Sequence, residues 1–137
     1  MKNSFIALFT VLISAFSFGQ TKEATYQLSS HILDVSKGMP APGVTIKLEK
    51  YNEKTKVWSQ VDEKVTDKSG RVHNFLPNDK SNLGIYKLTY MTSDYFKKMN
   101  EESFYPWVEV VFQLKDSEHY HVPITLSAYG YSTYRGN

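Results

Sequence analysis

The 137-residue chain contains no cysteine, which excludes disulfide bonds and any chemistry of a thiol. The chain also lacks a large excess of charge of either sign. Sixteen Lys and Arg residues against fourteen Asp and Glu residues leave a net charge of only +2, and both signs are interspersed. Such a chain offers neither the basic stripe of a nucleic-acid-binding domain nor a polybasic membrane-binding tail. Its length leaves room for one domain, whose stability must come from packing and assembly.

Long apolar runs are absent except at the start of the chain. Residues 5–18 form such a run after Lys2, and the small residues Ser17 and Gly19 follow at its end. The run is short for a membrane span, which needs roughly 20 residues. The pattern is typical of a secretory signal. We therefore expect a signal peptide at residues 1–19, a mature domain at residues 20–137 and an exported protein. In a Gram-negative source that means the periplasm.

Helical periodicity is nearly absent as well, and most of the mature chain alternates with a period of two. A loop rich in Gly and Pro at residues 36–43 and several polar turns separate the alternating segments. One short helix is expected at residues 93–100, and Pro123 predicts a strand edge or a split strand. Strands are expected at residues 26–35, 44–51, 56–66, 71–76, 85–92, 105–114 and 120–130. The pattern predicts an all-β sandwich of seven to eight antiparallel strands with one short helix.

Histidines are the most reactive side chains that this composition leaves, and the chain has four of them: His31, His73, His119 and His121. Residues two apart share a face of a strand, so His119 and His121 can act as a pair. Three chemistries remain open. The pair could bind a metal with a third ligand from His31 or Glu118. A Ser-His-Asp set is disfavoured because no G-x-S-x-G motif is present. A neutral histidine could activate water while an arginine holds an electron-rich substrate.

Three segments resemble a known family. "LSSHILDVSKGMPAPGVTIKL" is similar to the opening of the transthyretin-like family, "DKSGRV" to its middle and "HYHVPITLSAYGYSTYRGN" to its ending. The opening pattern also occurs in carboxypeptidase-regulatory-like β-sandwiches and is weakly specific. The terminal Y-R-G followed by one last residue is more specific, because it is typical of the enzymes of the family, the 5-hydroxyisourate hydrolases.

The resemblance implies a set of site residues, which are carried over by matching motif positions. His31, Arg71 and His121 would be catalytic, with the histidines activating water and the arginine holding the substrate. Tyr134 and the last residue, Asn137, would join His31 and Arg71 in binding it. The implied reaction is ring opening of 5-hydroxyisourate by water, with no metal and no organic cofactor. The implied assembly is a homotetramer, a dimer of dimers with pockets where dimers meet.

One position departs from the family pattern, because Asn137 stands where the enzymes usually end in Ser. Asn keeps a polar side chain but cannot carry a hydroxyl proton. Two alternatives follow. One is an exported transthyretin-like protein that binds a small molecule without hydrolysing it. The other is a metal-binding or accessory module that uses His119 and His121. His73 and His119 are otherwise expected at the surface or behind the site.

Overall fold

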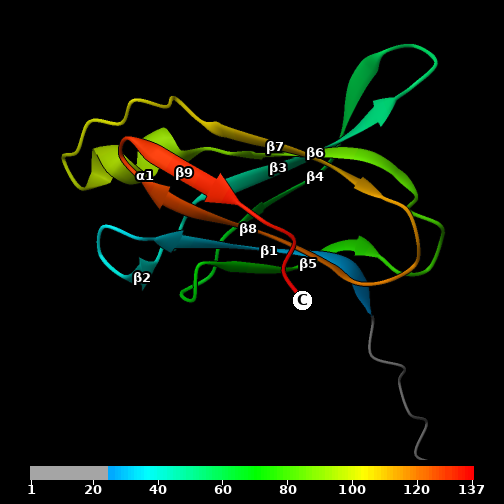
Figure 1. Ribbon diagram of the computed structural model, residues 1–137, viewed down its shortest axis with the longest axis horizontal. Coiled ribbons are helices and arrows are strands. Elements are labelled where there is room, and N and C mark those ends of the chain that lie inside the picture. Colours follow the sequence, from blue (N-terminus) through cyan, green and yellow to red (C-terminus); the bar gives the residue numbers. More distant parts are fainter. Residues whose placement is uncertain (1–24) are drawn as a thin grey trace, which may run out of the picture.

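Two β-sheets pack face to face in the computed structural model, which describes residues 25–137 (Figure 1). The four-stranded sheet has the order β4-β3-β6-β7, and the five-stranded sheet has the order β2-β1-β8-β9 with β5 also paired to β1. The elements are β1 (Tyr26–Asp34), β2 (Met39–Pro40), β3 (Thr45–Asn52), β4 (Val57–Val65), β5 (Arg71–Pro77), β6 (Gly84–Tyr90), α1 (Thr92–Lys98), β7 (Val108–Leu114), β8 (Tyr120–Ser127) and β9 (Gly130–Thr133). The expected signal peptide at residues 1–19 lies outside the described residues.

The predicted β-sandwich with one short helix is confirmed, with two differences in detail. The described residues form nine strands, because the Gly- and Pro-rich loop contributes the two-residue β2 and the C-terminal segment forms β9. The expectation that all strands pair antiparallel is wrong for β1 and β8, which run parallel. A parallel pair needs a long crossover connection, so alternation within each strand does not reveal it.

The core lies between the sheets and is built from one face of each strand. In β1 the side chains of Leu28, Ser30 and Ile32 point inward and are fully buried, so the residues between them point outward. The largest buried side chains come from both sheets and from α1: Leu28, Ile32, Ile46, Leu48, Phe75, Tyr86, Leu88, Tyr90, Phe96, Leu114, Ile124 and Leu126. No helix in residues 25–137 is long and apolar enough to cross a membrane.

Helix α1 is tied to the five-stranded sheet through a buried carboxylate. Asp34 at the end of β1 is fully buried and accepts hydrogen bonds from the backbone and hydroxyl of Ser36 and from the Tyr95 hydroxyl at 2.9 Å. Burial alone would raise the pKa of this carboxyl. The hydrogen bonds from Ser36 and Tyr95 outweigh burial and hold the pKa of Asp34 below its ordinary value.

Removing the tyrosine hydroxyl tests this link. We expect Tyr95→Phe to lower the free energy of unfolding at pH 7 by about 1.5–3 kcal/mol, the usual worth of a hydrogen bond to a charged group. This loss of stability should become smaller as the pH falls below 3.8, the ordinary pKa of Asp, because the hydrogen bond favours the ionised carboxylate, which becomes protonated in the folded protein. Urea unfolding at pH 7 and pH 3 measures both effects. Tyr129→Phe, at a side chain that is 70% exposed, is the control, and equal midpoints for the two variants would contradict the link.

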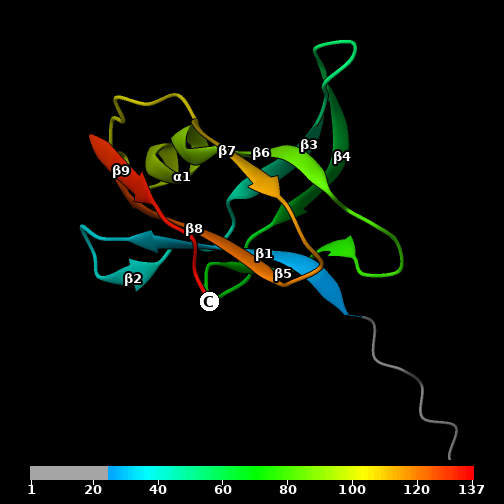
Figure 2. The ribbon, with the colours of Figure 1, turned by 45° about the vertical axis from the view of Figure 1, so that its right-hand side comes forward.

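The C-terminal segment runs along β8 beyond the end of β9, and Pro123 explains how. The backbone carbonyl of Pro123 faces this segment and accepts a hydrogen bond from the Thr133 hydroxyl at 2.9 Å. The missing N–H of Pro123 faces the same way, so the β8–β9 ladder stops there. Pairing resumes where the Gly136 amide donates to the His121 carbonyl at 2.8 Å. Strand β8 is continuous and lies between β1 and β9, so it is neither split nor an edge strand. The interruption that Pro123 predicts falls in the C-terminal segment that pairs with β8, between Thr133 and Gly136. In both ribbon views the C-terminus lies beside β1 and β8 (Figures 1 and 2).

Candidate active site

Three neighbouring strands, β5, β1 and β8, bring Arg71, His31 and His121 together on the outward face of the five-stranded sheet. His31 lies opposite Arg71 in the antiparallel β1–β5 pair. Ser29 lies opposite His121 in the parallel β1–β8 pair. Since Ser29 and His31 are two apart on β1, they share the outward face. The three residues that the resemblance implies as catalytic are therefore adjacent, although 90 positions of sequence separate the first histidine from the second.

The two histidines face each other. Their rings are nearly parallel, with centroids 6.4 Å apart and an interplanar angle of 28°, and both are half-buried. Burial and then the positive charge of Arg71 lower the pKa of His31, while the Asp67 carboxylate acts in the opposite direction. Burial, Arg71 and the neighbouring histidines lower the pKa of His121. Both rings are therefore held neutral at neutral pH, the form in which an imidazole can accept a proton.

Arg71 is positioned by the turn that precedes β5. The Asp67 carboxylate accepts hydrogen bonds from the amides of Ser69 at 2.8 Å and Arg71 at 3.0 Å. Gly70 adopts a φ of +69°, and a Cβ there would lie 2.7 Å from the Ile32 carbonyl. Its own carbonyl accepts the Ile32 amide at 2.9 Å. The turn is thus pinned to β1 next to His31, and only glycine fits at its last position.

Two further residues join the site: Ser29, which the motifs did not indicate, and His119, which the sequence pairs with His121 and places at the surface or behind the site. The Ser29 hydroxyl lies 2.8 Å from His121 Nδ1 and 2.8 Å from His119 Nε2. His119 Nδ1 lies 3.0 Å from the Tyr26 carbonyl. Ser29 stands within the quoted opening motif, but its role depends on the pairing of β1 with β8, which the sequence does not show. Within residues 25–137 no three His, Asp or Glu side chains converge as a metal site.

Gly136 packs directly on His121. A Cβ at this position would lie 2.5 Å from His121 Cδ2 and 3.1 Å from its Cγ. The same residue donates its amide to the His121 carbonyl. The glycine of the terminal Y-R-G therefore forms one wall against the imidazole, and any side chain there would displace the ring.

This contact predicts a loss of function without a loss of stability. Gly136→Ala should lower turnover by roughly 10²-fold, because a small displacement of a catalytic group has that scale of effect. The melting temperature should stay unchanged, since the segment lies at the surface. Gly130→Ala is the matched control, because a Cβ there meets nothing closer than Ser127 Oγ at 3.7 Å. Equal turnover in the two variants would show that the packing of Gly136 on His121 does not position the ring.

Within residues 25–137, the other two implied residues form no side-chain hydrogen bond or ring contact with the histidines. Tyr134 is 59% exposed and lines a cavity of about 260 Å³ with Phe112 of β7 and Tyr120 of β8, and neither His31 nor His121 lines this cavity. The neighbouring Arg135 guanidinium stacks over the Tyr120 ring at 4.4 Å. Asn137 is exposed next to Gly136. The described residues of one chain do not bring Tyr134 to the histidine pair, and the roles of Tyr134 and Asn137 stay predictions.

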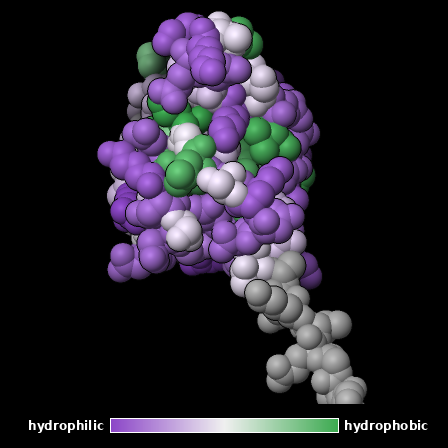
Figure 3. All heavy atoms as spheres, turned by 90° about the vertical axis from the view of Figure 1, so that its right-hand side faces the viewer, coloured by the Kyte–Doolittle hydropathy of each residue, from purple (hydrophilic) through white to green (hydrophobic). Residues whose placement is uncertain are grey.

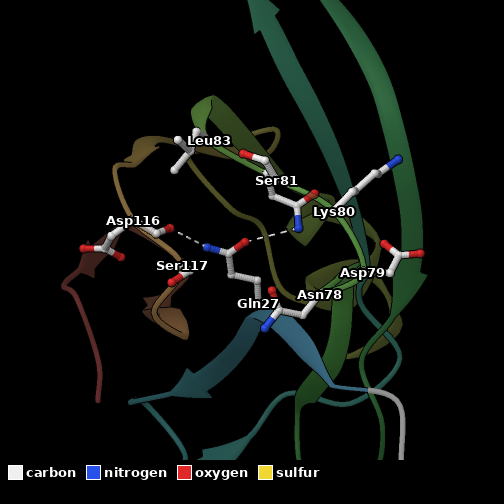
Figure 4. A pocket seen from close by; sticks show the side chains of 9 residues that line it. Gln27, Asn78, Asp79, Lys80, Ser81, Leu83, Asp116 and Ser117 are labelled. Carbon is white, nitrogen blue, oxygen red and sulfur yellow. Dashed lines mark hydrogen bonds between the residues drawn. The ribbon is translucent and has the colours of Figure 1, made fainter.

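A larger cavity, of about 430 Å³, opens at the start of β1 and contains none of the implied site residues (Figure 4). Across it the Asn82 amide donates to Gln27 Oε1 at 3.2 Å, and Gln27 Nε2 donates to the Asp116 carbonyl at 2.7 Å. Both side chains are buried. The side of the molecule that Figure 3 faces is mostly hydrophilic, with separate apolar patches. We interpret Gln27 as a brace: Asn82 orients its side chain, and its hydrogen bond to Asp116 holds the 115–119 segment against β1.

Known proteins resemble this chain over almost all of its described length. The sequence profile described as the HIUase/Transthyretin family matches residues 28–136. A Caenorhabditis elegans protein named as a probable 5-hydroxyisourate hydrolase is 41% identical over 98% of this chain and 99% of its own. The 5-hydroxyisourate hydrolase of Salmonella dublin is 43% identical over 80% of each chain.

Solved structures agree with the sequence relatives. The 5-hydroxyisourate hydrolase of Klebsiella pneumoniae is 35% identical and superposes with a TM-score of 0.69, covering 80% of this chain and 98% of its own. Sea bream transthyretin in complex with thyroxine is 29% identical with a TM-score of 0.75, covering 80% and 94%. Sequence and structure together show that the chain belongs to the HIUase/Transthyretin family.

Proposed function

We propose that this protein hydrolyses 5-hydroxyisourate. One observation carries the proposal: two histidines with lowered pKa values face each other beside an arginine, on three adjacent strands of a chain that belongs to this family. Relatives at 41% and 43% identity are named as hydrolases of this substrate. A protein that only binds a ligand has no need of a neutral base held next to a fixed cation.

The chemistry follows from the roles that these groups can fill. His121 takes a proton from water, whose oxygen then bonds to the ring amide carbonyl carbon. Arg71 stabilises the negative charge that develops on the carbonyl oxygen. The C–N bond of the ring breaks, the proton on His121 passes to the departing nitrogen, and a ureido-imidazoline carboxylate results. His31, with its ring 6.4 Å from that of His121, orients the water and the substrate.

The direct test generates 5-hydroxyisourate in situ from urate with urate oxidase and follows its ultraviolet decay after addition of residues 20–137. Decay well above the spontaneous rate supports the hydrolase. A folded protein that binds the substrate or thyroxine without accelerating decay supports the alternative of a transthyretin-like binding protein. Dialysis against chelator with unchanged rate argues against the metal-binding alternative.

A variant of Asn137 tests the one position that departs from the family ending. We expect Asn137→Ser to change the rate by much less than the roughly 10²-fold that an acid–base participant contributes. The reason is that the Asn137 side chain is exposed, whereas His121 already holds the base position. The same decay assay measures it. A large gain on restoring Ser would show instead that the terminal residue takes part in proton transfer.

Assembly and export belong to the same proposal. We expect a homotetramer, a dimer of dimers, because β7 and β9 end the two sheets as open edges. Exposed apolar and aromatic side chains lie in these strands or directly flank β9: Val111, Tyr129, Tyr131 and Tyr134. Pairing across these edges would cover them and could bring Tyr134 of one subunit toward another's site. Light scattering of residues 20–137 measures the mass.

Export with cleavage after Gly19 is tested by sequencing the N-terminus of the secreted protein.

A further inference from the structure

We propose that His119, an exposed residue outside the three catalytic positions, sets the tautomer of His121 through the Ser29 hydroxyl and so decides whether His121 can act as a base. The hydrogen-bond chain runs from the Tyr26 carbonyl through His119 and Ser29 to His121. Its consequence for hydrolysis rests on the function proposed above. The assignment of the protons rests on the geometry alone.

The Tyr26 carbonyl fixes the first proton. A carbonyl oxygen can only accept, and it lies 3.0 Å from His119 Nδ1. His119 must therefore carry a proton on Nδ1. A neutral imidazole has one N–H, so His119 Nε2 is left with its lone pair and acts as an acceptor.

The remaining protons follow in order. The Ser29 hydroxyl lies 2.8 Å from His119 Nε2, so it donates its single hydrogen there. Ser29 Oγ can then only accept from His121 Nδ1, which lies 2.8 Å away on the other side. His121 is thereby assigned a proton on Nδ1 and a free lone pair on Nε2. In the described part of the chain Nε2 has no hydrogen-bond partner, so this lone pair is available to a water molecule.

Protonation of His119 reverses the chain. With protons on both nitrogens, His119 donates through Nε2 to Ser29 Oγ, and the Ser29 hydroxyl turns to donate to His121 Nδ1. His121 then releases its Nδ1 proton to solvent and takes one on Nε2, so its net charge stays zero. In that state Nε2 is a donor and cannot remove a proton from water. An added proton on the exposed His119 thus disables His121 without ionising it.

The surroundings permit this behaviour. The charged and titratable groups whose charge acts on His121 are Arg71 and, more distantly, His73 from β5, His31 from β1, and His119. Burial, the charge of Arg71 and the neighbouring histidines together disfavour a charge on His121 and lower its pKa. The segment that carries His119 is anchored three residues earlier by Gln27, which donates to the Asp116 carbonyl. That anchor keeps His119 within reach of Ser29 while its ring remains open to solvent.

Nuclear magnetic resonance of the mature chain labelled with ¹⁵N-histidine tests the assignment without any variant. Long-range ¹H–¹⁵N spectra distinguish the two tautomers of each ring. At alkaline pH we expect Nδ1–H for both His119 and His121. As His119 takes up its proton, His121 should change to Nε2–H while remaining neutral. An Nε2–H form of His121 at alkaline pH, or no change during the His119 titration, would overturn the proposal.

Two variants separate a relay from a structural contact. Ser29→Ala removes the link, so the His121 tautomer should no longer follow His119 and kcat should fall roughly 10- to 100-fold with KM little changed. His119→Gln keeps an oxygen that accepts from Ser29 but cannot titrate, so His121 should stay Nδ1–H across the pH range. His73→Gln is the control and should leave both tautomers as in the parent. If the parent shows the tautomers but no hydrolysis, the proposed function fails and the relay stands.

Discussion

Replacing His121 with Asn is expected to lower the hydrolysis rate of 5-hydroxyisourate by about 10²–10⁴-fold, the contribution of one general base. Asn can still hydrogen-bond to Ser29, so the local packing should persist, but it offers no nitrogen that takes a proton from water. The free energy of unfolding should stay close to that of the parent, because the ring is only half-buried on the outer face of the sheet.

His73→Asn makes the matched comparison. It is the same change on the same face, but His73 is exposed and its ring contacts the Asp67 carboxylate at 3.3 Å rather than the other site residues. Ultraviolet decay of the substrate and thermal unfolding should be measured for both variants. If His121→Asn and His73→Asn hydrolyse the substrate equally fast, His121 is not the base.

Arg71→Gln should produce the second large effect, and in two ways. The loss of the cation removes the group that stabilises the developing oxyanion, which is worth about 10²–10³-fold in kcat. It also removes a positive charge that lowers the pKa of both His31 and His121. Since a histidine must be neutral to act as a base, activity falls as pH drops through its pKa. The acid limb of the pH–rate profile should therefore move to higher pH in this variant.

Arg71→Lys separates the two contributions. Lysine keeps the positive charge, so the histidine pKa values should stay depressed and the acid limb should remain where it is in the parent. It lacks the planar guanidinium fork, so the loss in kcat should persist in part. Profiles of kcat against pH for the parent and both variants give the comparison. An unmoved acid limb in Arg71→Gln would mean that burial alone depresses the histidine pKa values.

Most of the sandwich could be predicted because its signals are local. The alternation of residues 44–51 and 85–92 is confirmed by β3 and β6, and the single helical spacing by α1. The parallel β1–β8 pair could not be predicted, since it joins segments far apart in sequence and nothing in either strand specifies its neighbour. Strand β9 could not be predicted, because its four residues, with the exposed Tyr131 among them, lack a buried face.

The site was predictable only where a motif carried it. His31, Arg71 and His121 were indicated by the resemblance, and the strands place them side by side. Ser29 and Gly136 act through contacts across β1, β8 and the C-terminal segment, so their roles appear only once the pairing is known. Tyr134 shows the opposite limit, because a motif implied its role while the single chain places it beside Phe112.

The parallel pairing of β1 with β8 also constrains the order of events during folding. In the four-stranded sheet β3 pairs with β4, the next strand along the chain, and β6 pairs with β7 across α1, whereas Ser30 of β1 meets Val122 of β8 across 92 positions of sequence. Contacts of such high sequence separation are slow to form, because loop closure costs entropy before any contact compensates for it. The proposed site therefore forms only after β8, which carries His121, has paired with β1. A chain truncated before β8 is expected to lack hydrolase activity, and the decay assay measures this.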